Sequence, residues 1–262
     1  MKILFIGDIV GRPGREIVRV LLPELKKELV LDFVIANIEN AAGGSGITPA
    51  VANELFSFGI EAFTSGDHIF KKREAFSIIN EEPRLLRPAN FPLTSPGRGA
   101  GEFITKKGQP LILINLLGRV FMESRECPFR IAKEEIDKTK CKVILVDFHA
   151  EATSEKVAMG WYLDGLVSAV LGTHTHIQTA DEKILPSGTA YITDVGMTGP
   201  QHSVIGRKIE DVLTRFITQV DCRFQVAGED IELQGVVLDI DDKTGKAKSI
   251  TRIQRKLNDY QT

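Results

Sequence analysis

Two histidines, His174 and His176, are separated by one residue in the segment GTHTHIQTAD, which directly follows an apolar run. In an extended chain, side chains at positions i and i+2 lie on the same side, so both imidazoles can approach one metal ion or two adjacent ions. A lone histidine in such a turn is more often structural, because a neighbouring backbone group readily satisfies it. The pair therefore predicts a metal site only if other ligands exist elsewhere in the chain.

Further metal-binding side chains follow other apolar runs. In open α/β sheets, ligands bind in the loops beyond the carboxyl ends of the strands. The polar residues expected at such ends are Asp8, Glu39, Asn40, Asp67, His68, His149, His174 and His176. Asp8 and Asn40 each have an alternative role as turn formers. Four of the chain's five histidines lie in this set beside carboxylates, which favours a metal site over separate structural roles.

The donor types of this set narrow the choice of metal. Nitrogen and oxygen donors without thiolate favour iron, manganese or zinc and argue against a structural zinc cage. There are also too many donors for one ion. With one bridging carboxylate they suit two ions about 3.5–4 Å apart, an arrangement that holds the attacking and leaving oxygens during cleavage of phosphoryl esters.

Short β-branched runs that alternate with amphipathic segments predict an α/β fold with the sheet buried on both faces. We expect strands at 2–7, 33–38, 61–66, 110–118, 142–148, 166–172 and 189–196, and helices at 15–29, 49–58, 70–80 and 154–162. The last 40 or so residues alternate polar and apolar side chains around turn signals, which predicts antiparallel hairpins. Because no linker separates them from the rest, residues 1–262 are expected to form a single domain.

The composition limits the choice of partners. A net charge of −2 over 262 residues gives no electrostatic signal for a stable complex with long nucleic acid, although a small anionic substrate is compatible with it. No segment is apolar over the ~18 residues that a membrane span requires. Three separated cysteines, Cys127, Cys141 and Cys222, favour a reducing cytoplasm over a disulfide framework. The sequence is compatible with a homo-oligomer.

Longer strings carry a family resemblance. FIGDIVGRPGR, IENAAGG, LRPANFP, DFHAEATSEK, GTHTHIQTAD and YITDVGMTGP resemble the YmdB-like phosphodiesterases, a branch of the calcineurin-like metallophosphoesterases. This resemblance implies an α/β four-layer sandwich of two mixed β-sheets flanked by helices. It also implies a dinuclear centre, with iron as the first choice and manganese or zinc as alternatives. The implied reaction is hydrolysis of cyclic nucleotide phosphodiesters, 2',3'-cyclic and also 3',5'-cyclic.

The resemblance assigns roles to the residues at the strand ends. One ion would be held by Asp8, Glu39, Asn40 and His176, and the other by Glu39, Asp67, His149 and His174, with Glu39 as the bridge. A hydroxide bridging the two metals would attack phosphorus, and His68 would be the catalytic proton donor. The family motif reads Gly-Asn-His where this chain has Gly-Asp-His, so Asp67 adds a negative charge beside an anionic substrate.

Several alternatives stay open at this stage. The protein could be a regulatory metal-binding protein with weak or vestigial phosphoesterase activity, or a metal-dependent hydrolase of another bond such as an amide. Arg12 is either a contact to the substrate phosphate or a solvated surface residue, and Asn90 is either a substrate contact or part of a rigid turn. His202 is either structural or close to the substrate.

Overall fold

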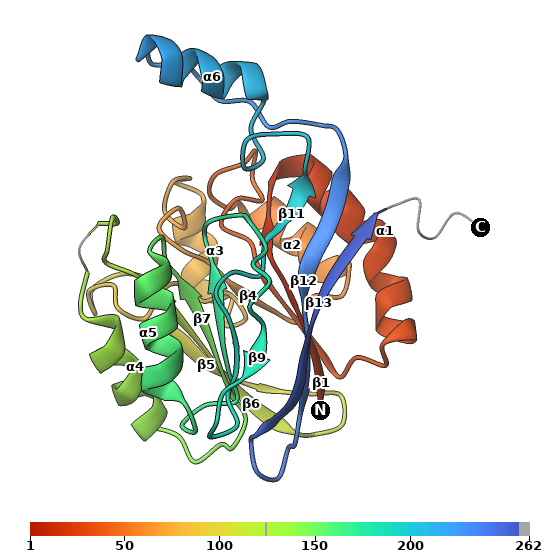
Figure 1. Cartoon of the computed structure of the whole chain (residues 1–262), viewed down its shortest axis with the longest axis vertical. Coiled ribbons are helices and arrows are strands. Elements are labelled where there is room, and N and C mark those ends of the chain that lie inside the picture. The colour runs from red at the N-terminus through yellow and green to blue at the C-terminus, as the bar shows by residue number, and fades with distance from the viewer. Residues whose placement is uncertain (124, 257–262) are drawn as a thin grey trace.

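The computed structural model describes residues 1–123 and 125–256 and contains two mixed β-sheets packed face to face (Figure 1). The first sheet has the strand order β2-β11-β12-β1-β3-β4, with β13 paired to β12. Its strands are β1 (Lys2–Ile6), β2 (Asp8–Ile9), β3 (Phe33–Asn37), β4 (Ala62–Thr64), β11 (Met197–Pro200), β12 (Ile231–Ile240) and β13 (Ala247–Lys256). Strands β1, β3 and β4 run parallel, whereas β12 pairs antiparallel with β1, β11 and β13.

The second sheet has the order β5-β6-β7-β8-β10-β9. Its strands are β5 (Ala100–Ile104), β6 (Pro110–Leu117), β7 (Ile144–His149), β8 (Ala169–Thr173), β9 (Lys183–Ile184) and β10 (Ala190–Ile192). The four strands from β6 to β10 in this order are parallel, and the two edge strands β5 and β9 are antiparallel to their neighbours. The sheet is therefore mixed as well.

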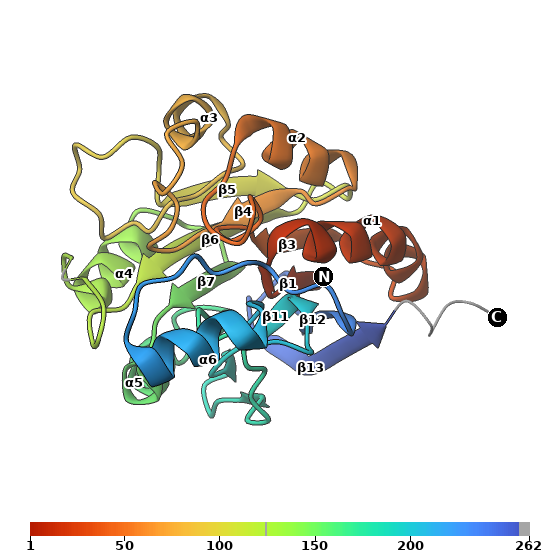
Figure 2. The same ribbon diagram turned by 90° about the horizontal axis from the view of Figure 1, so that it is seen from above.

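Helices cover the outer face of each sheet, which Figure 2 shows from above. The helices are α1 (Gly11–Glu28), α2 (Pro49–Ser57), α3 (Ala75–Glu81), α4 (Pro128–Asp137), α5 (Thr153–Leu163) and α6 (Ile209–Thr218). Helices α1, α2 and α3 pack on the first sheet, and α4 and α5 pack on the second. In the part of the chain that the structure describes, no helix combines the length and apolar character needed to cross a bilayer.

Three apolar cores separate the four layers, because successive side chains of a strand point to opposite faces. On β1, Ile3 and Phe5 pack in the core between the two sheets, whereas Leu4 and Ile6 pack in the core that contains α1. A third core joins the second sheet to α4 and α5. The predicted four-layer sandwich of two mixed sheets flanked by helices is confirmed.

The differences from the predicted elements have local causes. Helix α1 begins at Gly11 rather than at residue 15, because Pro13 is tolerated in a first helical turn and so does not delay the start. At Gly14, an added Cβ would lie 2.3 Å from the carbonyl oxygen of Thr198 on β11, so this glycine permits close packing of the helix on the sheet. Helix α3 begins at Ala75 rather than near residue 70.

Helices α4 and α6 were not predicted, and the C-terminal region forms one hairpin, β12–β13, rather than several. Helix α4 has a short apolar stripe, Ala132 and Ile136, in an otherwise charged segment. Helix α6 stands away from both sheets in Figure 1, and Val212 is its one buried residue. Both helices are nevertheless amphipathic in sequence, so apolar periodicity was a signal for them that the sequence reasoning missed.

Candidate metal centre

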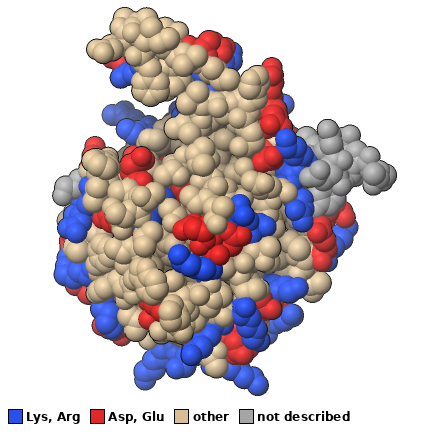
Figure 3. Space-filling model, in the orientation of Figure 1, with Lys and Arg blue, Asp and Glu red and all other residues tan. Residues whose placement is uncertain are grey.

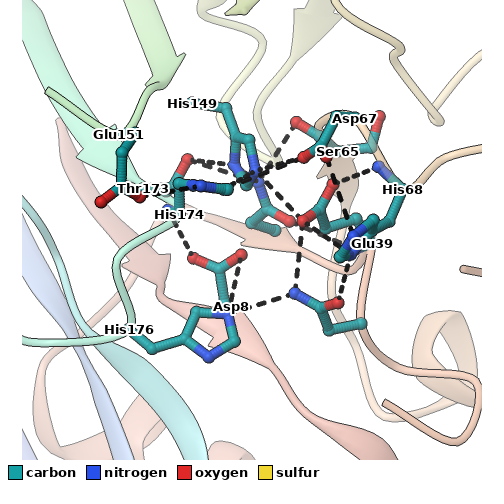
Figure 4. Close-up of polar contacts among 12 residues, drawn as sticks. Asp8, Glu39, Ser65, Asp67, His68, His149, Glu151, Thr173, His174 and His176 are labelled. Atoms are coloured by element: carbon teal, nitrogen blue, oxygen red, sulfur yellow. Dashed lines mark hydrogen bonds and ion pairs between the residues drawn. The ribbon is translucent and has the colours of Figure 1, made fainter. Parts of the chain in front are cut away.

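The ends of five strands bring the eight predicted site residues together at one edge of the two sheets, and Figure 4 labels all of them except Asn40. Asp8 begins β2 immediately after β1, and His149 is the last residue of β7. The remaining residues lie in the loops that follow β3, β4 and β8. They are Glu39 and Asn40, Asp67 and His68, and His174 and His176.

Glu39, Asp67, His149 and His174 form the tightest group, since each has a ligand atom within 4.8 Å of those of the others. His149 Nε2 lies 3.1 Å from Glu39 Oε1 and 3.0 Å from His174 Nδ1. Asp67 Oδ1 lies 3.5 Å from His149 Nε2 and 3.8 Å from His174 Nδ1. Donors that surround one cation at about 2.0–2.2 Å stand roughly 3–3.5 Å apart, so this group fits one metal ion.

A second group lies on the other side of Glu39. His176 Nε2 is 3.8 Å from Asp8 Oδ1, and the amide nitrogen of Asn40 is 3.2 Å from the same His176 atom and 3.3 Å from Glu39 Oε1. The amide oxygen of Asn40 instead pairs with Nδ1 of His68 at 3.0 Å. Asn40 thus lies where the second ion was predicted, but its amide would have to turn over to present oxygen to a cation.

The outer nitrogen of each histidine in the two groups has an oxygen partner, which fixes the ring and leaves the inner nitrogen facing the centre. The pairs are His149 Nδ1 with Thr173 Oγ1 at 2.9 Å, His174 Nε2 with Glu151 Oε2 at 3.1 Å, and His176 Nδ1 with the carbonyl oxygen of Ile205 at 3.0 Å. A metal-binding imidazole commonly donates its other N–H to a carboxylate, carbonyl or hydroxyl oxygen in this way.

A buried polar layer beneath His149 was missed by the sequence reasoning. The Thr173 hydroxyl donates to Asp147 Oδ1 at 2.7 Å, and the amide of Asn37 donates to Asp147 Oδ2 at 3.1 Å. The signal for Asp147 was present, because it stands two residues before His149 on the same face of β7. Glu151 was also missed.

Two carboxylate oxygens at this site lack a hydrogen-bond donor. Asp8 Oδ1 and Asp67 Oδ1 are buried without a hydrogen-bond partner among the described residues. A buried, unsatisfied carboxylate oxygen is costly, and a cation removes that cost by replacing the lost hydration. Each of the two groups contains one of these oxygens, so the residues present fit one cation in each group.

Burial and neighbouring charges both shift the pKa values of the predicted ligands. Burial disfavours the charged imidazole of His149, but Glu39 and Asp67 outweigh burial and raise the pKa of His149 well above its usual value. Burial raises the pKa of Asp8 to about 7, with Glu39 adding to the shift and His149 opposing it. Burial, reinforced by the positive charge of His149, lowers the pKa of His174 to about 4. Asp8 and His149 therefore hold protons at positions where a cation would also be stabilised.

The loop after β8 has an unusual backbone. His174 has φ 101° and His176 has φ 64°, a region that residues other than glycine rarely adopt. Two carboxylates hold the loop in this shape: Asp8 Oδ2 accepts the His174 N–H at 3.2 Å, and Asp194 Oδ2 accepts the Thr175 N–H at 3.1 Å. Such strain persists where surrounding contacts over-determine the conformation, most often at functional sites.

Asp194 is itself held by a buried ion pair. Lys156 Nζ donates to Asp194 Oδ2 at 2.6 Å and to the carbonyl oxygen of Thr173 at 2.7 Å, and both charged side chains are fully buried. Because α5 supplies Lys156, this ion pair connects the helix to the loop that carries the two histidines.

The glycine of the Gly-Asp-His motif has a steric role. A Cβ at Gly66 would lie 2.2 Å from His149 Nε2 and 2.4 Å from Glu39 Oε2. Any side chain at this position would occupy the centre of the ligand group.

Three other candidates lie outside the ligand groups. Arg12 is largely exposed and pairs with Glu16 at 3.8 Å, as expected for a solvated surface residue. Asn90 is buried and its amide donates to backbone carbonyls at 2.8 and 3.1 Å, which supports the rigid-turn role. His202 is exposed and pairs with Glu229 at 3.0 Å.

Comparison with known proteins identifies the family. Residues 4–253 match the YmdB-like protein family. The chain belongs to the YmdB-like family. It is 50% identical over 255 residues to the 2',3'-cyclic-nucleotide 2'-phosphodiesterase of Bacillus subtilis (strain 168), and the match covers 97% of this chain and 96% of that protein.

Two solved structures superpose closely on this one. A hypothetical protein from Thermus thermophilus is 38% identical with a TM-score of 0.92, and the match covers 97% of this chain and 99% of the other. A phosphatase from Mycoplasma pneumoniae is 35% identical with a TM-score of 0.92, covering 97% and 93%. The predicted family and the prediction of a hydrolase are confirmed.

Proposed function

We propose that this YmdB-like protein is a metal-dependent phosphodiesterase that opens 2',3'-cyclic nucleotides at the 2' ester bond. The observation that carries the proposal is the pair of adjacent ligand groups, each with a buried carboxylate oxygen that lacks a donor. The Bacillus subtilis relative, named for that reaction, supports the choice of substrate. Hydrolysis of 3',5'-cyclic nucleotides is the second activity that we propose to test.

We propose that two transition-metal ions, with iron as the first choice, are held by the two groups and share Glu39. The shared position is consistent with the contacts of Glu39 to His149 on one side and to Asn40 on the other. When bound, the ions would supply positive charge to the phosphoryl oxygens and lower the pKa of the attacking water.

His68 is the residue that we propose as the proton donor to the leaving sugar oxygen. Its Nδ1 is held by the amide oxygen of Asn40 at 3.0 Å, and its backbone N–H donates to Glu39 Oε2 at 3.0 Å. The ring borders the open cavity in front of the ligand groups. Its Nε2, 3.7 Å from Asp67 Oδ2, is the nitrogen left to meet a substrate. An alkoxide is a poor leaving group, so such a proton transfer contributes roughly 10²–10⁴ in rate.

An assay of the metal-loaded protein against four compounds tests this function. Hydrolysis of 2',3'-cyclic AMP to the 3'-nucleotide is expected, with bis-p-nitrophenyl phosphate also cleaved and a p-nitroanilide left intact. Cleavage of the anilide alone would identify a hydrolase of amide bonds. The fourth compound, 3',5'-cyclic AMP, tests the second activity. If the protein binds metal and cleaves none of the four compounds, the alternative of a regulatory metal-binding protein with vestigial activity is favoured.

Metal analysis tests the dinuclear proposal separately. Protein purified without chelator is expected to hold two ions per chain, and Glu39→Ala is expected to lower the occupancy of both sites, because each group loses an anionic donor. Saturation at one ion, or full loading of one site in Glu39→Ala, would contradict a shared Glu39.

We further propose that residues 1–262 form one domain and that the protein acts in the cytoplasm. A homo-oligomer is compatible with these proposals.

A further inference from the structure

A cavity of about 530 Å³ extends from the ligand groups to helix α6. Ligand pockets for small molecules commonly measure about 300–1,000 Å³, so this space is large enough for a mononucleotide. One end of the cavity is formed by Glu39, Asn40, His68, His174 and His176. The opposite wall is formed mainly by apolar side chains and two arginines, which the reaction described above does not use.

The apolar wall comes from one face of α6 and from the segment that follows it. Val212 and Phe216 are four residues apart, so they lie on the same face of the helix, and Phe224 lines the same cavity. Phe216 remains 76% exposed and Phe224 36% exposed, so part of each side chain is accessible to a ligand. In Figure 3 the projecting part at the top of the molecule carries mainly uncharged side chains above an indentation.

Arg207, in the loop before α6, adds a positive charge to the wall. Its guanidinium is half-buried and donates to the carbonyl oxygen of Gly44, and it forms no ion pair with a carboxylate among residues 1–123 and 125–256. Burial lowers the pKa of Arg207, with no carboxylate to offset that loss of hydration. By contrast, Arg215 on the same wall is paired with Asp221. An arginine in the setting of Arg207 favours an anionic ligand with paired oxygens, such as a phosphate.

We propose that this cavity is the nucleoside-binding subsite, in which the substrate base packs on Phe216 and Phe224 and Arg207 contacts the phosphate. The proposal rests on the proposed function, since it assigns the base and phosphate of that substrate to one continuous cavity. Aromatic side chains stack on any nucleobase, because every base has a π-face. The subsite therefore recognises the presence of a base more than its identity.

The test compares a substrate that has a base with one that lacks it. 2',3'-cyclic AMP and glycerol 1,2-cyclic phosphate share the five-membered phosphate ring, but glycerol cyclic phosphate has no base. Phe216→Ala is expected to raise KM for 2',3'-cyclic AMP roughly 5- to 100-fold and to leave KM for glycerol cyclic phosphate unchanged. Ile217→Ala is the matched control, because Ile217 is 77% exposed on the same helix and does not line the cavity.

Arg207→Gln is expected to raise KM for both substrates, because both carry the phosphate, and Arg207→Lys is expected to recover part of the loss. Metal content must stay at the parental level in both variants, which excludes damage to the neighbouring ligand loop.

The affinity for 3'-AMP, measured by calorimetry, tests Phe216 without turnover. Phe216→Ala is expected to weaken this affinity by the same factor by which it raises KM for 2',3'-cyclic AMP.

Several outcomes would overturn the subsite. One is an unchanged affinity for 3'-AMP in Phe216→Ala, and another is an equal rise in KM for both substrates in that variant. A third is a change of oligomeric state caused alike by Phe216→Ala and Ile217→Ala, which would identify α6 as a contact between two copies of the chain. If the parent protein cleaves neither substrate yet binds 3'-AMP through Phe216, the proposed reaction fails while the subsite stands.

Discussion

At the scale of single residues, the variant of His68 tests proton transfer independently of metal binding. His68→Ala is expected to keep its metals and to lose about 10²–10⁴ in kcat on cyclic nucleotides. The loss should be smaller on bis-p-nitrophenyl phosphate, since p-nitrophenolate leaves without protonation. Steady-state kinetics on both substrates check this, with His202→Ala as the control because His202 is exposed and lies outside the ligand groups. Equal losses on both substrates would rule out His68 as the acid.

Asp67 is the residue at which we expect this chain to depart from the Gly-Asn-His motif of its family. Its Oδ1 faces His149 and His174, and its Oδ2 faces His68, so an amide in its place can still offer one oxygen to a cation. Asp67→Asn removes a negative charge beside a transition state that gathers negative charge. We expect kcat to rise by about tenfold, which corresponds to about 1.4 kcal/mol.

The comparison for Asp67→Asn must be made at saturating metal, because the amide binds a cation more weakly than a carboxylate does. Asp67→Ala, which lacks any ligand atom, is the control and should lose metal. A fall in kcat of Asp67→Asn at full occupancy would mean that the carboxylate is adapted to this site.

At the scale of elements, the strand ends could be predicted because each one combines a run of apolar residues with a polar residue at its carboxyl end. All eight residues predicted from that pattern lie at one edge of the sheets. The partners beneath them could not be predicted in the same way. Lys156 on α5 and Asp194 after β10 are 38 positions apart, and only the packing of α5 on the sheet brings them together.

The Lys156–Asp194 pair gives a prediction at this scale. Asp194→Asn is expected to lower the free energy of unfolding by about 3–5 kcal/mol, because it leaves a buried lysine without its counter-charge. It should also weaken metal binding, since Asp194 holds the loop that carries His174 and His176. Thermal unfolding and metal titration measure the two effects.

Glu134→Gln is a suitable control for Asp194→Asn, because Glu134 belongs to an exposed pair with Arg130 on α4, for which a cost below about 1 kcal/mol is expected. If Asp194→Asn unfolds earlier but binds metal with unchanged affinity, the pair stabilises the fold without shaping the ligand loop.

At the scale of the whole molecule, metal binding should couple to stability and pH. Burial raises the pKa of Asp8 from 3.8 to about 7, and the carboxylates raise that of His149 above 6.5. Both groups hold protons more tightly in the folded protein than in the unfolded chain, so the stability of the metal-free protein falls as pH rises through neutrality. His174 has the opposite effect, because its pKa is lowered to about 4 in the folded protein. Its contribution to the stability therefore rises between about pH 4 and pH 6.5 and does not change at higher pH.

Metal ions replace these protons, so the gain in Tm on adding Mn²⁺ to chelator-treated protein should be larger at pH 8.5 than at pH 6.5. Differential scanning calorimetry at the two pH values measures the gain. Asp8→Asn should reduce the dependence on pH, because it removes one of the groups whose pKa is raised to the neutral range. A gain that is equal at both pH values would contradict the coupling.

The position of β12 bears on how the protein is made. Residues 231–240 form an interior strand of the first sheet, between β1 and β11, although β1 contains residues 2–6. On the ribosome, every residue of the two ligand groups is synthesised before β12, the strand that fills the position between β1 and β11. The nascent chain therefore has its metal ligands exposed before their frame is complete. The first sheet is complete only after the β12–β13 hairpin has left the exit tunnel.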